Sequence, residues 1–387
     1  MSTLYLALIA TTTLWILGGL VALARVRRRS RLGSLPGPLE SVSVLKPLCG
    51  ADDSLEANLR TFFEQDHDDY ELIFGLKGED DPALEIVRRL RSEYPDLRSR
   101  IVVHGGGRGL NPKVDNLRAM MAAVSHDVIV ISDSNVAVHR GYLRQAQSEL
   151  LEAGTGLVTH LIVGAGERSL GAAVEALHMS GSVAGGVAMA TEFIKHPAVI
   201  GKSMMFRHSL FERLGGFGSV ANVLAEDYVV GRMFHEAGYR VRLCAEPILN
   251  VGTRTSLRAF FRRQERWAMM RLRLQPLAFL LEPMTIPLFM AALAPLFGVD
   301  GRLALAWALG ITLLRDGLQW TMLRGSAGLL RALPLFPLRD LLVLAAFASA
   351  PFRRHVTWRG KRVRISAGSR LYAEGEPEAS DELLVEG

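Results

Sequence analysis

The chain has 387 residues, which is enough for one large domain or two. Hydrophobic residues make up 49% of it and the mean hydropathy is positive, which is high for a soluble enzyme and indicates segments that enter a membrane. An aromatic content of 7% argues against a protein that stacks single-stranded nucleic acid on aromatic side chains. The net charge of +6 lies mainly beside apolar segments, so we expect a membrane partner and no nucleic acid.

The first segment, residues 1–24, is predicted to be a transmembrane helix. Residues 4–24 contain no charged side chain, and about 20 such residues cross a bilayer core of roughly 30 Å. Arginines follow at once, beginning with Arg25. A signal peptide carries its bases before the apolar core, so an uncleaved helix is favoured. The basic linker, residues 25–40, and the domain that follows it then face the cytoplasm, which in a bacterium means the inner membrane.

Residues 41–255 alternate between patterns typical of strands and of amphipathic helices. Four strands are predicted from short β-branched apolar runs at residues 41–48, 71–77, 100–104 and 127–132. Helices fill the intervals, and the third of them is predicted over residues 111–125, where Val114 and Leu117 lie on one face. Repeated β-α-β units predict an α/β domain with a mostly parallel sheet.

The C-terminal third is predicted to return to the membrane. Residues 256–275 place arginines and apolar residues at helical spacing, which indicates an amphipathic helix in the interface. The membrane region, residues 276–352, contains three apolar stretches at residues 276–297, 303–323 and 338–352. Because both its flanks are basic, we expect two crossings plus one interfacial or re-entrant piece, for which the short third stretch is the candidate. A basic juxtamembrane segment (residues 353–372) and an acidic, disordered tail (residues 373–387) complete the chain.

Asp133 directly follows the fourth predicted strand, at the edge where parallel sheets bind ligands. Its carboxylate is a candidate ligand for Mg²⁺ or Mn²⁺, which share oxygen ligands between protein and phosphate. Asn135 stands where a second acid would make a stronger site. A carboxylate that only caps the next turn is the alternative interpretation.

Three further charged residues stand at predicted helix starts. Asp80 and Asp81 follow the second strand, where they can bind a nucleotide, but Asp81 precedes Pro82 and can equally cap the next helix. Lys113 follows a glycine-rich loop at a helix start, where backbone N–H groups favour phosphate. An ordinary surface lysine is the alternative there.

Acidic and basic groups recur downstream. Glu226 and Asp227 stand near a helix start, where they either favour the helix dipole or share a site in which one acid becomes a general base. Arg263, Arg266 and Trp267 lie in the basic helix, where arginines can clamp a diphosphate and the indole can wall the sugar. An ordinary interfacial helix is the alternative for these three residues.

Together these groups predict transfer of a sugar from a nucleoside diphosphate. That reaction neutralises a departing diphosphate, removes a proton from the acceptor hydroxyl and holds both partners in line. Acids at two strand ends, a later acid pair and arginines before the membrane segments occur in the order that such a site requires. A membrane scaffold or nucleotide-binding protein without turnover is the alternative class.

The chain resembles the ceramide glucosyltransferases of glycosyltransferase family 21, which are related to family 2 and to bacterial hopanoid glycosyltransferases. The resemblance extends from Val44 to about residue 368. The matching segments are Leu45-Lys46-Pro47-Leu48, Asp80-Asp81-Pro82-Ala83, Asn111-Pro112-Lys113 with Asn116-Leu117, Asp133-Ser134, Gly201-Lys202-Ser203-Met204, Ala225-Glu226-Asp227-Tyr228, Arg263 with Arg266-Trp267, and Thr357-Trp358-Arg359-Gly360-Lys361 with Arg362-Val363-Arg364.

The resemblance implies a GT-A type nucleotide-sugar-binding domain, a UDP-sugar donor, a divalent cation and an inverting reaction that gives a β-linked glycolipid, with glucose and ceramide as the expected sugar and acceptor. It implies a metal ligand in Asp133 and a general base in Asp227. The other catalytic residues that it implies are Arg263, Arg266 and Trp267. Its donor-binding residues are Lys46, Pro47, Asp80, Asp81, Lys113, Asp133 and Glu226.

Two related activities remain open at this stage. A hopanoid or another lipid is an alternative acceptor, because the hopanoid enzymes share much of the same pattern. A family 2 processive polysaccharide synthase is the other alternative, although its channel needs more membrane segments than this sequence predicts.

Overall fold

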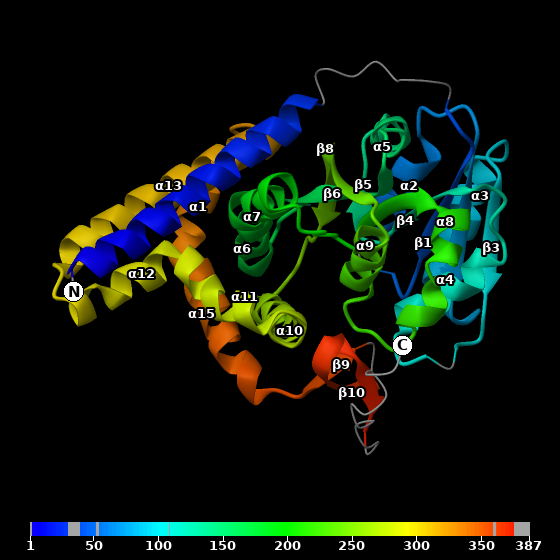
Figure 1. The fold of residues 1–387 in the computed structure, drawn as a ribbon. Helices are drawn as coiled ribbons and strands as arrows, with labels where there is room; N and C mark the ends of the chain where they lie inside the picture. The colour runs from blue at the N-terminus through cyan, green and yellow to red at the C-terminus, as the bar shows by residue number, and fades with distance from the viewer. Residues whose placement is uncertain (1, 30–38, 52–53, 108, 359–360, 375–387) are drawn as a thin grey trace.

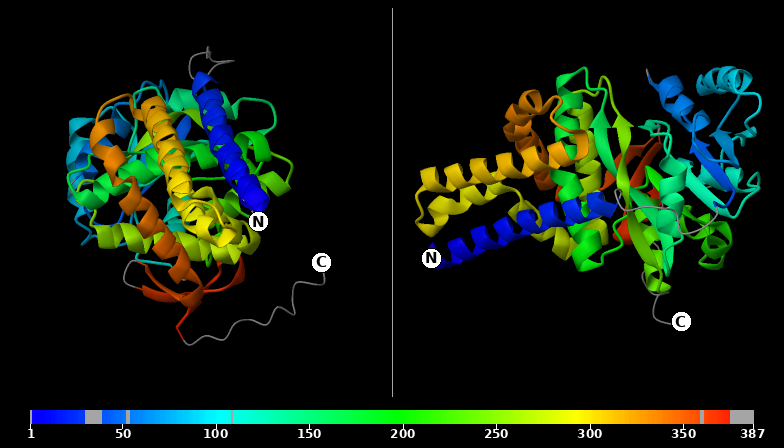
Figure 2. Two further views of the ribbon diagram at one scale, coloured as in Figure 1. Left: turned by 90° about the vertical axis from the view of Figure 1, so that its left-hand side faces the viewer. Right: turned by 90° about the horizontal axis from the view of Figure 1, so that it is seen from above.

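The computed structural model describes residues 2–29, 39–51, 54–107, 109–358 and 361–374. They form an α/β domain and a helical unit that projects from one side of it (Figures 1 and 2). The N-terminus lies at the far end of the helical unit, away from the sheet. Residues 375–387 of the predicted acidic tail and most of the predicted linker fall outside the described residues, whereas Ala373, the first residue of that tail, belongs to a strand.

A mixed sheet lies at the centre of the α/β domain. Within the described residues it has eight strands in the order β3-β2-β1-β4-β7-β6-β8-β5. Their bounds are Val42–Pro47 (β1), Tyr70–Leu76 (β2), Ser99–Val103 (β3), Val128–Ser132 (β4), Val136–Ala137 (β5), Thr155–Ala165 (β6), Ser203–Arg207 (β7) and Arg240–Val251 (β8). β1 pairs in parallel with β2 and β4, and β2 pairs in parallel with β3, whereas β7 runs antiparallel between β4 and β6. The four predicted strands and their parallel pairing are confirmed.

Helices cover both faces of this sheet. Their bounds are Leu55–Phe63 (α2), Ala83–Glu93 (α3), Pro112–Met121 (α4), Tyr142–Leu150 (α5), His208–Arg213 (α8) and Glu226–Glu236 (α9). Side chains of β1 alternate between the two faces: Val42 and Val44 pack with α2, α3 and α5, and Leu45 packs with α4, α8 and α9. Asn111 caps α4 with its side chain. The helix ends at Met121, one turn before the predicted end at residue 125.

The helical unit consists of the N-terminal apolar helix and the helices of the C-terminal apolar region. Its helices are Ser2–Arg29 (α1), Pro276–Leu281 (α11), Pro287–Leu293 (α12), Gly301–Arg324 (α13), Leu329–Ala332 (α14) and Phe336–Ser349 (α15). Two helices of the described residues are long and apolar enough to cross a membrane, namely Thr3–Arg29 and Leu329–Phe352. A third candidate is the helix pair Pro276–Thr285 and Pro287–Phe297, if these two helices, which are bent by 82°, form one span. The bend therefore falls in the first apolar stretch, and the third stretch, expected to be short, belongs to a helix of 24 residues.

α1 is docked on the α/β domain by its last turns. Arg27 forms an ion pair with Glu246 at 2.7 Å and donates to the carbonyl oxygen of Ala245. Further along, α1 packs closely against α7 (Ala184–Met189), since a Cβ atom at Gly19 would lie 3.0 Å from the carbonyl oxygen of Gly185. The first residues of the predicted basic linker are thus helical and contact the catalytic domain.

Four charged side chains are buried between α13 and α15. Asp316 accepts hydrogen bonds from Arg315 at 2.8 Å and from Arg339 at 2.6 Å. Arg339 also donates to Asp340 at 2.7 Å. Because charges without water are tolerated only when paired, this network fixes α15 against α13.

Two C-terminal elements join the helical unit to the α/β domain. The first is α10 (Leu257–Leu274), which buries Phe260 and Met269 and packs against α15 and α6 (Leu170–His178). The second is a three-stranded sheet, β9 (His355–Trp358), β10 (Lys361–Ile365) and β11 (Leu371–Ala373), where the sequence suggested a basic juxtamembrane segment. Its apolar residues pack with residues of α10 in one cluster.

Candidate active site

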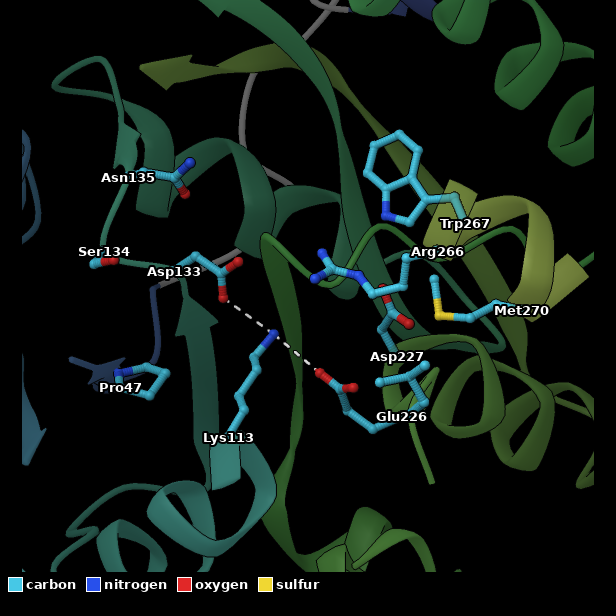
Figure 3. A pocket seen from close by; sticks show the side chains of 11 residues that line it. Pro47, Lys113, Asp133, Ser134, Asn135, Glu226, Asp227, Arg266, Trp267 and Met270 are labelled. Carbon is cyan, nitrogen blue, oxygen red and sulfur yellow. Dashed lines mark ion pairs between the residues drawn. The ribbon is translucent and has the colours of Figure 1, made fainter. Parts of the chain in front are cut away.

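A cavity of about 300 Å³ opens beside the carboxyl ends of β1 and β4. Three segments far apart in the sequence contribute to it: the start of α4, the start of α9 and the middle of α10 (Figure 3). The residues that line it are Pro47, Lys113, Asp133, Ser134, Asn135, Leu224, Glu226, Asp227, Arg266, Trp267 and Met270. Seven of the eleven residues predicted for the site are thus brought together here.

Lys113 is the central cation of the cavity. Its ammonium group lies 3.0 Å from the carboxylate of Asp133 and 3.1 Å from that of Glu226, and it donates to the carbonyl oxygen of Gly201 at 3.0 Å (Figure 3). Burial alone would lower the pKa of Lys113, but the surrounding carboxylates outweigh burial and hold it above its ordinary value. Lys113 is therefore a fixed positive charge rather than a surface lysine.

Asp133 receives two lysine ammonium groups at the rim of the cavity. One oxygen pairs with Lys113, and the other lies 3.5 Å from Lys202, which also donates to the side-chain oxygen of Asn135 at 2.8 Å. Burial would raise the pKa of Asp133, but the two ammonium groups outweigh burial and hold it below its ordinary value. Asp133 is consequently ionised, and it is paired with two cations.

Glu226 and Asp227 occupy neighbouring positions but different environments. Glu226 is buried, where it pairs with Lys113 and accepts a hydrogen bond from Asn111 at 3.2 Å. Burial, reinforced by the charge of Asp227 and opposed by Lys113, raises the pKa of Glu226. Asp227 is less buried and faces the cavity.

Backbone N–H groups hold the carboxylate of Asp227. One oxygen accepts from the N–H of Gly201 at 2.7 Å and the other from the N–H of Tyr228 at 2.8 Å. The approach of Gly201 is so close that a Cβ atom there would lie 2.5 Å from the carboxylate. These two hydrogen bonds fix the position of the Asp227 carboxylate at the edge of the cavity.

Arg266 and Trp267 enter the cavity from α10 (Figure 3). Within the described residues the guanidinium of Arg266 has no hydrogen bond or ion pair, although it lies in the field of Glu226. Burial lowers its pKa, against the opposing effect of Glu226. A half-buried cation without a partner among the described residues has donors available for an anionic ligand.

Arg263, one turn before Arg266, faces a different pocket. It forms an ion pair with Glu175 of α6 and lines a second cavity of about 360 Å³ beside residues 250–255. Burial and the charge of Arg266 lower the pKa of Arg263 to about 10. Asn135 lines both cavities, so the two are neighbours.

Three of the predicted donor-binding residues lie outside the cavity lining. Lys46 is buried beneath it, where it donates to the backbone oxygen of Asp133 at 2.7 Å and to Ser132 at 3.2 Å. Asp81 accepts from the N–H of Gly50 at 3.0 Å and from the next helix at 2.9 Å, so its contacts are those of the capping alternative. Asp80, the third of these residues, is exposed beside it.

Lys202 is the residue whose place in this cluster the sequence interpretation missed. It belongs to the Gly201-Lys202-Ser203-Met204 segment, to which no role was given. The backbone N–H of Asp133 donates to the carbonyl oxygen of Lys202 at 3.2 Å, because β7 pairs with β4. Burial lowers the pKa of Lys202, although the charge of Asp133 opposes this.

The sheet and the charged cavity at its parallel strand ends define an α/β ligand-binding domain attached to a membrane-type helical unit. The chain belongs to glycosyl transferase family 21, whose sequence profile matches residues 5–371. The α/β fold of GT-A type that the resemblance implied is therefore confirmed.

Individual relatives agree with this family. The chain is 30% identical over 252 residues to ceramide glucosyltransferase 3 of Caenorhabditis elegans, a match that covers 65% of the chain and 54% of that protein. It is 27% identical over 351 residues to ceramide glucosyltransferase 1 of the same organism, covering 87% and 74%. The chain thus spans about half the length of the first relative. Among solved structures, a mannosyltransferase from Pyrobaculum calidifontis in complex with GDP-Man and Mn²⁺ has a TM-score of 0.49 and 19% identity, covering 89% of this chain and 98% of that one.

Proposed function

We propose that this chain is an inverting membrane glycosyltransferase that moves a hexose, glucose in the first instance, from a UDP-sugar to the hydroxyl of ceramide. The observation that carries the proposal is the meeting of Asp133, Lys113, Asp227 and Arg266 around one cavity. Membership of glycosyl transferase family 21 and the likeness to ceramide glucosyltransferases support it.

In this proposal the cations of the cavity receive the donor diphosphate. Lys113 is fixed among carboxylates, and Arg266 has free donors, so both can neutralise charge that grows as UDP departs. Trp267 supplies a flat wall for the sugar beside Arg266. The uridine extends toward Asp80 and Asp81, which follow the neighbouring strand β2.

Asp227 is the proposed general base. The acceptor oxygen attacks the anomeric carbon while the bond from that carbon to the diphosphate oxygen breaks, and the hydroxyl proton passes to the Asp227 carboxylate. A single displacement of this kind inverts the anomeric configuration and gives a β-linked lipid from an α-linked donor. The N–H groups of Gly201 and Tyr228 hold the carboxylate during the transfer.

The residues at the rim fit a divalent cation shared with the donor. The described residues contain no group of three or more acids, histidines or cysteines able to hold a metal by themselves. Mg²⁺ and Mn²⁺ bind through one or two protein oxygens plus phosphate and water, and Asp133 with Asn135 supplies such oxygens. The cation would neutralise the departing diphosphate.

A binding experiment tests the role of Asp133. Calorimetric titration of UDP with and without Mn²⁺ is expected to show metal-enhanced binding in the native chain and none in Asp133→Ala. Retention of the full metal effect in that variant would assign the metal ligand elsewhere. Lys202, which pairs with the same carboxylate, is expected to compete with the cation.

The proposed site lies on the cytoplasmic side of the membrane, in a bacterium the inner membrane. Basic residues follow the apolar part of α1, and Arg27 at its end contacts the α/β domain, so the domain and these bases share one side of the bilayer. Labelling of single cysteines in right-side-out and inverted vesicles checks this orientation.

Mass spectrometry of lipids tests the activity itself. Cells with and without the chain are grown with and without added sphingolipid. A hexosyl ceramide is expected to accumulate only in cells that express the chain and receive the sphingolipid. Purified chain in nanodiscs, given UDP-glucose, UDP-galactose or UDP-glucuronic acid, then identifies the donor. Detection of a modified hopanoid or a long glycan would show that ceramide is not the acceptor. UDP binding without any sugar transfer would refute the proposed glycosyltransferase activity.

A further inference from the structure

We propose that the C-terminal sheet, β9 to β11, is a functional part of the active site, and that Ser369 is a positioning residue for Asp227. The inference rests on the proposed function, because that function gives Asp227 its role. Ser369 lies more than 140 residues downstream of Asp227 in the sequence, and it touches the segment that leads directly into α9.

Ser369 holds the backbone of the two residues that lead into α9. The residue at the N-cap of α9 is Ala225, whose side chain cannot accept a hydrogen bond. The hydroxyl of Ser369 accepts from the N–H of Ala225 at 3.1 Å, and its carbonyl oxygen accepts from the N–H of Leu224 at 2.9 Å. Two consecutive amides ahead of Glu226 and Asp227 are therefore held by one distant residue.

The backbone at Ser369 indicates that this contact is enforced. Ser369 is fully buried and has φ = 60°, next to Gly368 with φ = 64°. A left-handed conformation is unfavourable for a residue with a Cβ atom. Only the surrounding structure maintains it, and here it aims both oxygen atoms of Ser369 at the start of α9.

Further contacts extend the attachment along the same segment. The N–H of Leu371 donates to the carbonyl oxygen of Asn222 at 2.7 Å, and Val223 forms a β-bridge with Arg370. Leu224, which lines the cavity, shares an apolar cluster with Leu371. The C-terminal sheet thus fixes residues 222–225 by both their backbone and an apolar side chain.

The opposite side of the segment is held by the donor half of the site. Asn111, the cap of α4, donates to the carbonyl oxygen of Val223 at 2.7 Å and to Glu226 at 3.2 Å. Its backbone N–H donates to the carbonyl oxygen of Ala221 at 3.1 Å. The segment is clamped between α4, which carries Lys113, and the C-terminal sheet, so loss of the Ser369 hydroxyl removes one contact on the side of the sheet and leaves the contacts with α4 unchanged.

The variant Ser369→Gly tests this arrangement in the full-length chain in nanodiscs. Glycine accepts the left-handed backbone but lacks the hydroxyl. Hydrogen exchange is expected to accelerate in residues 222–228 and to stay unchanged in the peptide that contains Lys113. The matched control is Arg362→Ala, an exposed side chain of β10 that pairs with Glu374 at 3.5 Å.

The turnover number of Ser369→Gly distinguishes a role in positioning Asp227 from a general loss of stability. With UDP-glucose and ceramide as probes, kcat per UDP-binding site is expected to fall on the order of 10- to 100-fold in Ser369→Gly, since small misplacements of a reacting group have such effects. The UDP dissociation constant is expected to stay within about twofold, because Lys113 and Asp133 are held by other elements. A merely structural role would reduce the number of UDP sites and leave kcat per site unchanged.

The two readouts distinguish the possible failures. If the native chain transfers no sugar, the proposed function fails, and the exchange experiment alone decides whether Ser369 holds the segment. Unchanged exchange in residues 222–228 overturns the positioning inference in every case. Faster exchange together with native kcat per site also overturns it, because the contact would then have no effect on the reaction.

Discussion

Replacement of Asp227 by asparagine is the most direct perturbation of the proposed chemistry. The change conserves shape and removes only the proton acceptor. In the structure the two oxygens of Asp227 accept from the N–H groups of Gly201 at 2.7 Å and Tyr228 at 2.8 Å. An asparagine oxygen can keep one of these bonds, whereas its amide group turns a donor toward the other N–H.

The expected loss follows from the role of a general base. A positioned base contributes about 10²- to 10⁴-fold to the rate, which corresponds to about 3–5 kcal/mol at roughly 1.4 kcal/mol per tenfold. The loss should appear in kcat, because the base acts only on the transferring proton. UDP binding should persist, since the donor contacts proposed for Lys113 and Arg266 remain.

The matched control is Asp127→Asn. Asp127 likewise accepts from a backbone N–H, that of Ser209 at 2.7 Å, and from its hydroxyl at 3.1 Å. It precedes β4, at the opposite end of that strand from Asp133. The variant therefore has the same charge change without the base. UDP release with ceramide gives kcat, and calorimetry gives UDP affinity. If Asp227→Asn retains turnover within about threefold of Asp127→Asn, Asp227 is not the base.

Three further predictions concern packing, pH and stability. Gly201→Ala is expected to displace the Asp227 carboxylate, 2.5 Å from the new Cβ atom, and to lower kcat about 10- to 100-fold with UDP affinity retained; native turnover would contradict it. Burial lowers the pKa of Lys202 from 10.5, so the ammonium that competes with the cation for Asp133 is lost as the pH rises through this lowered value; metal-enhanced UDP binding should therefore strengthen toward alkaline pH, and Lys202→Arg should abolish that increase, which titrations of UDP with Mg²⁺ across alkaline pH will check. Asp316→Leu is expected to destabilise the chain by about 3–5 kcal/mol, because the buried Arg315 and Arg339 both lose this carboxylate and Arg339 keeps only Asp340; an unchanged melting temperature in detergent would refute this.

The first four strands and the alternation of their side chains could be predicted, because the periodicity of the sequence encodes them. Each of the first four strands is a short apolar run, and the side chains of β1 alternate between two clusters. Such patterns depend only on neighbours within a few residues. Strand order does not, and the insertion of antiparallel β7 between β4 and β6 brings Lys202 to Asp133 from 69 residues away. No local sequence pattern predicts that β7 pairs with β4 and β6.

The candidate site likewise contains features that local sequence predicts and features that depend on packing between distant elements. The sequence placed Asp133 at a strand end and Asp227 at a helix start, and the structure brings both to one cavity. Arg263 and Arg266 were treated as one clamp because they are one turn apart, yet Glu175 of α6 draws Arg263 into the neighbouring pocket. Which neighbour a side chain meets is decided by packing across elements, and one sequence does not contain that information in its spacing.

The C-terminal sheet shows how two patterns coexist in one segment. Its arginines were assigned to a basic juxtamembrane segment, but Arg362 and Arg364 alternate with Val363 and Ile365, which is the period of a half-buried strand. In β10 the apolar pair is buried in the cluster that contains Leu224, while Arg362 is exposed. Charge on the outer face therefore does not compete with packing on the inner face. A segment that follows the apolar helices can thus carry charge on its outer face and pack against Leu224 of the cavity lining with its inner face.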